Sequence, residues 1–331
     1  MLMYKNGARY NSIGPWLKEY FGCRTVKAAI DAGFTCPNRD GTKGFGGCIY
    51  CSEEGSGEYA GTVGKGISAG EKKIPVPVKD FQASDDPYDQ ITSQLSFIEE
   101  KWSHPLCIAY FQNFTNTYAP VRRLEELYRN ALSHPDCAGI AIATRPDCIG
   151  SDTLDLLDRL NHETFLWVEL GLQTSDNETA RIINRCCTTE EYDDCAGRLI
   201  SRGIRVVTHL IYGLPGEDRK TMLESTRHIC EKKIFGVKLH MLNILKNTAI
   251  EKMWRSGEIH LMSRDEYISL VCDALEIIPR EITIHRLTGD APADLLLAPD
   301  WIPDKRAVLN GINHELKRRG SVQGCRCGAG G

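Results

Sequence analysis

Three cysteines near the amino end of the chain have a spacing that suits metal chemistry. Cys36, Cys48 and Cys51 form a C-x11-C-x2-C pattern directly after an apolar segment, AAIDAGF. Thiolates are the ligands of structural zinc ions and of iron–sulfur clusters. A structural zinc ion takes four ligands, usually as two close pairs, whereas this segment offers one close pair and one distant cysteine. Three thiolates suit a cubane cluster that leaves one iron open.

The segment between these cysteines is crowded with glycines, at positions 41, 44, 46 and 47. Glycine lets the backbone approach a ligand closely and adopt positive φ angles, so the segment suits a loop wrapped around a bound group. A zinc loop completed by a distant Cys or His is the alternative that the spacing leaves open.

The residues that follow alternate between buried strands and amphipathic helices. The strand-like segments are short and rich in β-branched or aromatic residues, and the segments between them have apolar residues at helical spacing. Regular alternation of this kind predicts a parallel sheet with right-handed crossovers, which closes partly into a barrel or lies open. The six predicted strands lie at 25–34, 107–114, 139–147, 164–173, 204–215 and 236–245.

The pattern is weaker at two places. Residues 52–80 are rich in Gly, Lys and Glu and predict a long loop. After residue 261 we expect a helix, then a strand, then a helix, at 263–278, 281–288 and 304–320.

These features divide the chain into three parts. We expect an N-terminal extension at 1–25, a core at 26–260 and a C-terminal helical extension at 261–331. The last part ends in a Gly-rich tail with Cys325 and Cys327, which we expect to be flexible.

Polar residues stand where several of the predicted strands end. The carboxyl ends of parallel strands form one edge of a sheet, and ligand crevices lie at that edge. Polar side chains there are hard to explain as packing, and a buried Glu inside an apolar strand is costly unless it is paired. The residues in such positions are Gln112, Asn113, Thr115, Asn116, Arg145, Glu169 and Gln173.

The cysteine segment and two of the strand ends resemble the radical S-adenosylmethionine (SAM) superfamily. FTCPNRDGTKGFGGCIYC is similar to the YhcC/YtqA-type proteins, which share its wide first cysteine gap. TRPD at 144–147 and GLPGE at 213–217 resemble segments of the Elongator catalytic subunit, in the branch that includes oxygen-independent coproporphyrinogen oxidase. The resemblance covers roughly residues 10–315 and implies an α/β fold, a partial (β/α)6 TIM-like barrel with N- and C-terminal extensions.

The resemblance also implies cofactors and their ligands. A [4Fe-4S] cluster would be held by Cys36, Cys48 and Cys51, and SAM would bind at the open iron. The reduced cluster would cleave SAM and generate a 5′-deoxyadenosyl radical that abstracts hydrogen from a substrate. By the same resemblance, Tyr50 would lie near the SAM adenine and Glu169 at its ribose hydroxyls. The other residues implied at SAM are Gln112, Asn113, Thr115, Asn116, Arg145, Gln173, Arg185, Gly213 and Pro215.

A substrate class is implied as well. The Elongator subunit acts on carbon 5 of the wobble uridine of tRNA, and the YtqA-type group is connected with a step from carboxymethylaminomethyl to aminomethyl side chains. Basic residues near both ends of the chain, with Trp16, Tyr20 and Phe21 interleaved at the first, fit a surface for RNA. The alternatives are a small porphyrin-like substrate, or a zinc- or cluster-binding RNA adaptor without enzymatic activity. Candidates for a radical-quenching residue are Tyr118, Cys148, His209, His240 and His285.

Composition and charge indicate in which compartment of the cell we expect the protein. The net charge is −4, and the composition is that of a soluble globular protein. The sequence shows neither an apolar h-region of a secretory signal nor an apolar run of the ~20 residues that a membrane helix needs. We therefore expect a cytoplasmic protein without a membrane partner, whose 14 cysteines stay reduced. For the cluster we expect an electron donor of the flavodoxin or ferredoxin type.

Overall fold

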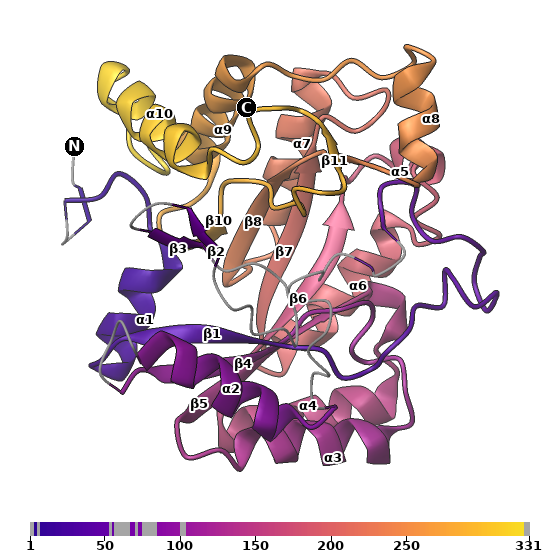
Figure 1. Cartoon of the computed structure of the whole chain (residues 1–331), viewed down its shortest axis with the longest axis vertical. Helices are drawn as coiled ribbons and strands as arrows, with labels where there is room; N and C mark the ends of the chain where they lie inside the picture. Colours follow the sequence, from indigo (N-terminus) through magenta and orange to yellow (C-terminus); the bar gives the residue numbers. More distant parts are fainter. Residues whose placement is uncertain are drawn as a thin grey trace.

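A curved sheet of seven parallel strands organises the chain. The computed structural model describes residues 3–4, 7–52, 55, 67–69, 72–74, 85–99 and 104–327. Within these residues the strand order is β1-β4-β5-β6-β7-β8-β10, and the sheet bends into a half-barrel (Figure 1). The strands are β1 (Thr25–Ile30), β4 (Leu106–Phe111), β5 (Cys137–Thr144), β6 (Phe165–Gln173), β7 (Arg205–Tyr212), β8 (Gly236–Met241) and β10 (Thr283–Arg286).

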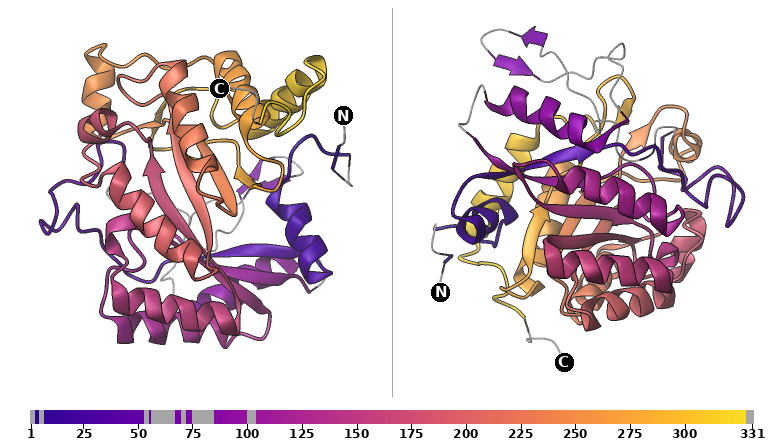
Figure 2. Two further views of the ribbon diagram at one scale, coloured as in Figure 1. Left: turned by 180° about the vertical axis from the view of Figure 1, so that it is seen from behind. Right: turned by 90° about the horizontal axis from the view of Figure 1, so that it is seen from below.

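Helices cover the outer, convex face of this sheet, as the view from behind in Figure 2 shows. Every second strand residue points outward and joins one large apolar core with the helices. No helix among the described residues is long and apolar enough to cross a membrane. The helices with a covering role are α2 (Pro87–Glu99), α3 (Val121–Leu132), α4 (Ser151–Glu163), α6 (Thr189–Ser201), α7 (Arg219–Cys230), α9 (Arg264–Ile277) and α10 (Lys305–Arg318).

Short elements connect the strand ends on the cysteine side. A 3-10 turn η1 (Pro146–Cys148) follows β5, and helix α5 (Asn177–Ile182) follows β6. The strands β9 (Ile244–Leu245) and β11 (Leu296–Ala298) pair in antiparallel fashion, and α8 (Ala249–Arg255) follows β9.

An aromatic cluster fills the other end of the half-barrel. Helix α1 (Ile13–Phe21) packs into the concave face, where Trp16 stacks on Tyr20 with ring centroids 5.1 Å apart. Trp16 also meets Phe235 edge-on at 5.0 Å, just before β8 begins. Phe165, the first residue of β6, touches Trp16, Tyr20 and Phe21. These rings pack on one another at the amino ends of the strands, and Tyr20 stays exposed.

Most predicted elements are present. All six predicted strands form, and the segment at 281–288 adds a seventh, β10, beside β8. Inside the predicted loop at 52–80, the short strands β2 (Ile67–Ala69) and β3 (Lys72–Ile74) form a hairpin, and the remainder apart from Ser52 and Gly55 lies outside the described residues.

The chain just before Cys325 and Cys327, in the tail that we expect to be flexible, contacts the fold through one side chain. Gln323 is fully buried, and its amide donates to the carbonyl oxygens of Pro279 and Ile282 at 2.7 and 2.8 Å. Its side-chain oxygen accepts from the backbone N–H of Asn11 at 2.8 Å. One glutamine therefore links the tail to the N-terminal segment and to the turn between α9 and β10. Residues 328–331 lie outside the described part.

Candidate active site

A cavity of about 370 Å³ lies inside the half-barrel, a size in the range of small-molecule sites. It lies between the cysteine segment and the concave faces of β4, β6, β7 and β8. The predicted site residues that line it are Cys36, Cys48, Tyr50, Cys51, Gln112, Thr115, Arg145, Glu169, Gln173 and Arg185.

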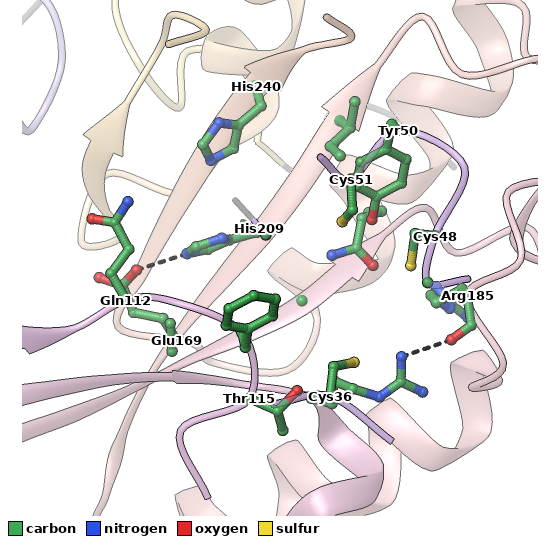
Figure 3. Close-up of a pocket in the computed structure, with 18 of the residues that line it drawn as sticks. Cys36, Cys48, Tyr50, Cys51, Gln112, Thr115, Glu169, Arg185, His209 and His240 are labelled. Atoms are coloured by element: carbon green, nitrogen blue, oxygen red, sulfur yellow. Dashed lines mark hydrogen bonds and ion pairs between the residues drawn. The ribbon is translucent and has the colours of Figure 1, made fainter. Parts of the chain in front are cut away.

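The three cysteines form one side of the cavity. Figure 3 shows Cys36, Cys48 and Cys51 facing a common space, with Glu169 and His209 on the opposite side. Among the described residues, no three His, Cys, Asp or Glu side chains are arranged to hold a single metal ion. A cubane cluster takes one thiolate on each of several irons, and three thiols that line one cavity without converging on a point fit that group.

A pair of asparagines shapes the cysteine segment. Buried Asn38 donates through Nδ2 to the backbone oxygen of Asn184 at 2.6 Å, and the same nitrogen lies 3.7 Å from Cys48 Sγ. In return, Asn184 Nδ2 donates to the backbone oxygen of Gly47 at 2.8 Å. Gly44 packs so closely on Asn38 that a Cβ there would collide with its side chain, and Gly47 adopts a φ of 76°. These contacts tie the cysteine segment to the turn after α5.

Arg145 supports the same turn. Its guanidinium makes two bonds of 2.9 Å to the carboxylate of Asp147, which explains the Arg and Asp of the TRPD segment. Its remaining donors reach the backbone oxygens of Arg185 at 2.8 Å and Cys186 at 3.1 Å. Arg145 therefore positions the chain next to Cys48 as well as lining the cavity.

Arg185 is also engaged with the main chain. The side chain is buried, and it donates to the carbonyl oxygens of Cys187 at 2.6 Å and Thr174 at 2.7 Å, and to that of Leu172. An arginine in this position holds the end of β6 against the following turn. The resemblance implied a contact between Arg185 and the SAM carboxylate, and the structure shows a main-chain role for most of its donors.

Four of the residues implied at SAM lie outside the lining of the cavity. Asn113 donates to Asp31 Oδ2 at 2.6 Å, and Asn116 donates to the backbone oxygens of Asn113 and Ala143, both at 2.9 Å. Gly213 adopts a φ of 87°, which starts the turn after β7, and Pro215 is buried within that turn. These residues shape the strand ends that surround the cavity.

A buried charged cluster forms the opposite side of the cavity, and Glu169 lies at its centre. Glu169 Oε1 accepts hydrogen bonds from Trp167 Nε1 at 2.9 Å and Lys27 Nζ at 3.2 Å. Its other oxygen, Oε2, accepts from His209 Nε2 at 2.7 Å and from Lys238 Nζ. The resemblance placed Glu169 at the SAM ribose, but in this structure both of its oxygens are engaged by protein groups.

The charges of this cluster set its protonation. Burial by itself would raise the pKa of Glu169, but the charges of Lys238 and Lys27 and the hydrogen bond from His209 hold that pKa well below its usual value. Burial and the charge of Lys238 lower the pKa of His209 to about 4. Glu169 is therefore ionised and His209 is a neutral donor at pH 7.

Sequence reasoning missed both lysines and Tyr110, whose hydroxyl accepts from Lys238 Nζ at 2.8 Å. The available signal was a single charged residue inside an otherwise apolar strand, Lys27 in TVKAAI and Lys238 in GVKLHM. A charged residue inside an apolar strand was also the reason for which Glu169 was predicted as a site residue.

The five candidates for radical quenching separate in the structure. His209 and His240 line the cavity, whereas His285 packs edge-on against Trp167 with ring centroids 5.6 Å apart. The hydroxyl of Tyr118 lies 2.8 Å from Thr42 Oγ1, and the thiol of Cys148 points at Asp147. The last three lie outside the lining of the cavity.

Comparison with known families matches most of the chain. Residues 36–229 match the model of the radical SAM superfamily, and residues 234–318 match the radical SAM C-terminal domain. The first match begins at Cys36 and ends within α7, so it contains the cysteine segment and strands β4 to β7.

Individual relatives and a solved structure extend this match. The protein YtqA of Bacillus subtilis is 44% identical over 316 residues, which cover 96% of this chain and 92% of YtqA. The tRNA uridine(34) acetyltransferase of Methanocaldococcus jannaschii is 26% identical over 328 residues, which cover 91% of this chain and 57% of that enzyme. The structure of Methanocaldococcus infernus Elp3 lacking residues 1–46 has a TM-score of 0.64 at 20% identity, covering 73% of this chain and 61% of that one, and so shares the fold.

Proposed function

The chain belongs to the radical SAM superfamily, and we propose that it modifies the carbon-5 side chain of the wobble uridine of tRNA. The step that we propose converts a carboxymethylaminomethyl group to an aminomethyl group. The two carboxymethyl carbons would leave as glyoxylate, with its aldehyde oxygen from water, and SAM would accept the two electrons on cleavage to methionine and 5′-deoxyadenosine. The superfamily uses a [4Fe-4S] cluster and SAM, so the protein is a radical SAM enzyme with these two cofactors.

The cavity with three thiols on one side supports the assignment of the cluster ligands. We propose that Cys36, Cys48 and Cys51 hold the cluster, because their thiols are free and line the same cavity. When bound, the cluster and SAM supply one-electron cleavage of a sulfonium and hence hydrogen abstraction from carbon. The protein's own contribution is to hold the cysteine segment in shape through Asn38 and Arg145.

For SAM we propose the remaining polar residues that line the cavity near the carboxyl edge of the sheet. Tyr50 lies between two of the cysteines, and Gln112, Thr115 and Gln173 come from the carboxyl ends of β4 and β6. Ligands of open α/β sheets bind at this edge. Glu169 and its partners would then delimit the far side of the site and hold their charges in fixed positions.

The observation that carries the tRNA substrate is the similarity to the tRNA uridine(34) acetyltransferase, which extends over 91% of this chain. The match leaves a large part of that relative uncovered, so the proposal concerns its substrate, tRNA uridine 34, and not its acetyl transfer. A buried, strongly polar cavity wall is also suited to a charged side chain on a base.

Nucleoside mass spectrometry of tRNA tests the substrate. In cells that lack the gene, we expect carboxymethylaminomethyluridine to accumulate at position 34 and the aminomethyl-type nucleosides to disappear. Re-expression of the wild-type protein should restore them. An unchanged set of wobble uridines in the deletion strain would refute the proposed substrate.

Cysteine variants test the cluster ligands. After anaerobic reconstitution with iron and sulfide, the wild-type protein should show the visible absorption of a [4Fe-4S] cluster and form 5′-deoxyadenosine from SAM. We expect Cys36→Ala, Cys48→Ala and Cys51→Ala each to reduce both signals to background. Cys23→Ala, which changes a cysteine outside the cavity, is the matched control and should behave as wild type. A Cys48→Ala protein with a normal cluster would contradict the assignment.

A further inference from the structure

We propose that Arg286, Lys238 and His240 form a carboxylate-binding subsite on the side of the cavity away from the cysteines. All three residues line the cavity and come from the adjacent strands β8 and β10. The inference rests on the proposed function, because it assigns the subsite to the carboxylate of the carboxymethylaminomethyl group of the substrate. The subsite would allow the enzyme to distinguish a uridine with a carboxymethylaminomethyl group from a uridine whose side chain has no carboxylate.

The first observation is an imbalance of charge. Lys27, Lys238 and Arg286 bring three cationic side chains to this side of the cavity, and Glu169 is the carboxylate that the two lysines share. Burial lowers the pKa of both lysines, the charge of Glu169 raises it, and the charge of Arg286 lowers it further. A second anion would complete the cluster.

The second observation is an arginine without a protein acceptor. Arg286 is the last residue of β10 and lies directly beside Lys238 in the sheet. Among the residues that the structure describes, the half-buried Arg286 side chain makes no hydrogen bond or ion pair. The nearby acid that also lines the cavity, Asp290, is bound to Lys305 Nζ at 2.6 Å. A guanidinium fork exposed to a cavity matches the two oxygens of a carboxylate.

The third observation concerns two further donors. His240 Nε2 is buried and has no hydrogen-bond partner within the described part of the chain, and the ring lies 5.3 Å from that of His209. The ammonium of Lys238 has three N–H groups, of which two are directed to Tyr110 and Glu169. One N–H of Lys238 and the His240 nitrogen therefore remain available for a ligand next to Arg286.

The location favours the substrate over SAM as the source of the carboxylate. SAM must bind next to the cluster, and Figure 3 shows the cysteines on one side of the cavity, with His240, His209 and Glu169 away from them. The carboxylate of SAM is the other source of the same chemistry, and the experiment below separates the two.

The primary test measures small probes on the anaerobically reconstituted, SAM-bound enzyme. The probes are N-methylglycine, which carries an amine and a carboxylate like the substrate side chain, and N-methylglycinamide, which lacks the carboxylate. By calorimetry or ligand-observed NMR, we expect the wild type to bind the carboxylate about 10- to 100-fold more tightly, as for hydrogen bonds to charged groups. Arg286→Gln should remove this preference, and Arg286→Lys should retain part of it.

A matched control is Arg306→Gln, which removes the same charge from an exposed position on α10 and should keep the preference. Equal binding of the two probes by wild type would overturn the subsite. So would an Arg286→Gln protein that is folded, as judged by its circular dichroism and cluster absorption, and still prefers the carboxylate.

A second measurement identifies the source of the carboxylate. We expect Arg286→Gln to raise KM about 10-fold or more for an anticodon stem-loop with carboxymethylaminomethyluridine, and to leave the Kd of SAM unchanged. A weakened Kd for SAM with an unchanged KM would assign the subsite to SAM and overturn the inference. Should the probe preference depend on Arg286 while tRNA from the deletion strain is unchanged, the proposed tRNA substrate fails and the carboxylate subsite stands.

Discussion

The two faces of the central sheet use the same strands for different purposes. On the concave face, Glu169, His209 and Lys238 form a hydrogen-bonded charged cluster. Each is followed in the sequence by a leucine that is fully buried on the convex face, at positions 170, 210 and 239. Because strand side chains alternate, one residue step separates a polar group in the cavity from a leucine in the core.

The comparison shows that the same strands carry both the apolar core and the lining of the cavity, and that the direction of each side chain decides which of the two it joins. The convex face buries apolar surface, which stabilises the fold by about 25 cal/mol per Å². The concave face buries the charges of Glu169, Lys27 and Lys238, which are tolerated because the carboxylate is paired with both lysines. Substitutions of neighbouring residues should therefore have different consequences, and four predictions test this.

Glu169→Ala should have the largest effect. It leaves Lys27 and Lys238 buried without their counter-charge, and we expect a loss of about 3–5 kcal/mol in the free energy of unfolding. Urea unfolding followed by circular dichroism measures the loss, and SAM cleavage should fall to background in the folded fraction. A loss below about 1 kcal/mol, the range of exposed ion pairs, would show that the cluster is solvated and would remove the contrast between the faces.

Leu170→Ala, one residue further along β6, should destabilise the protein by about 2–5 kcal/mol through lost apolar burial and a cavity. Because this side chain points away from the site, the rate of SAM cleavage per folded molecule should match that of wild type. The comparison of Glu169→Ala with Leu170→Ala is thus a direct test of the two faces. Equal loss of specific activity in both variants would contradict it.

Acidification should lower the free energy of unfolding through a group on the concave face, His209. The pKa of His209 is about 4 in the folded protein against 6.5 as its ordinary value. Between these values the unfolded state binds more protons, so stability falls as the pH falls, by about 2 kcal/mol from pH 7 to pH 5. Unfolding curves across this range measure the fall. His209→Gln should be less stable at pH 7 but should lose less on acidification; an identical pH dependence in both proteins would exclude His209 as the cause.

The smallest effect is expected far from the cavity, in the helical layer. Ser263 caps α9 and forms a capping box with Glu266. Ser263→Ala should reduce the free energy of unfolding by about 1 kcal/mol, with SAM cleavage and its pH dependence unchanged. A change in the kinetics of SAM cleavage would mean that the helical layer influences the site.

The strands and the cysteine segment could be predicted from the sequence because their signals are local. Three cysteines in one segment, and apolar runs separated by helical periods, need no knowledge of the rest of the chain. The local sequence did not identify Lys27 and Lys238 as site residues, because a charged residue in a short strand is equally typical of a position that faces solvent. Only the curvature of the sheet, which turns the concave face into a closed interior, decides between the two readings.

Polar residues at strand ends were predictable as important but not in their role. Asn116 and Arg185 stand where a ligand site was expected, and the structure uses them mainly to satisfy backbone carbonyl groups. Buried turns need such donors as much as a cofactor does, so the sequence alone does not separate the two uses. Gln323 shows the same limit near the tail, where the sequence did not indicate its buried hydrogen bonds to Pro279 and Ile282.

The hydrogen bond from Asn38 to Asn184 spans 146 positions of the sequence. During synthesis the cysteine segment emerges early, but the turn that gives it its shape is made only after two further strand–helix units have followed β4. The segment cannot adopt its final form before Asn184 has been made, so we expect iron to be delivered after that point and not as soon as the three cysteines emerge. One contact between two asparagines thus sets the earliest stage of synthesis at which the cysteine segment can have its final shape.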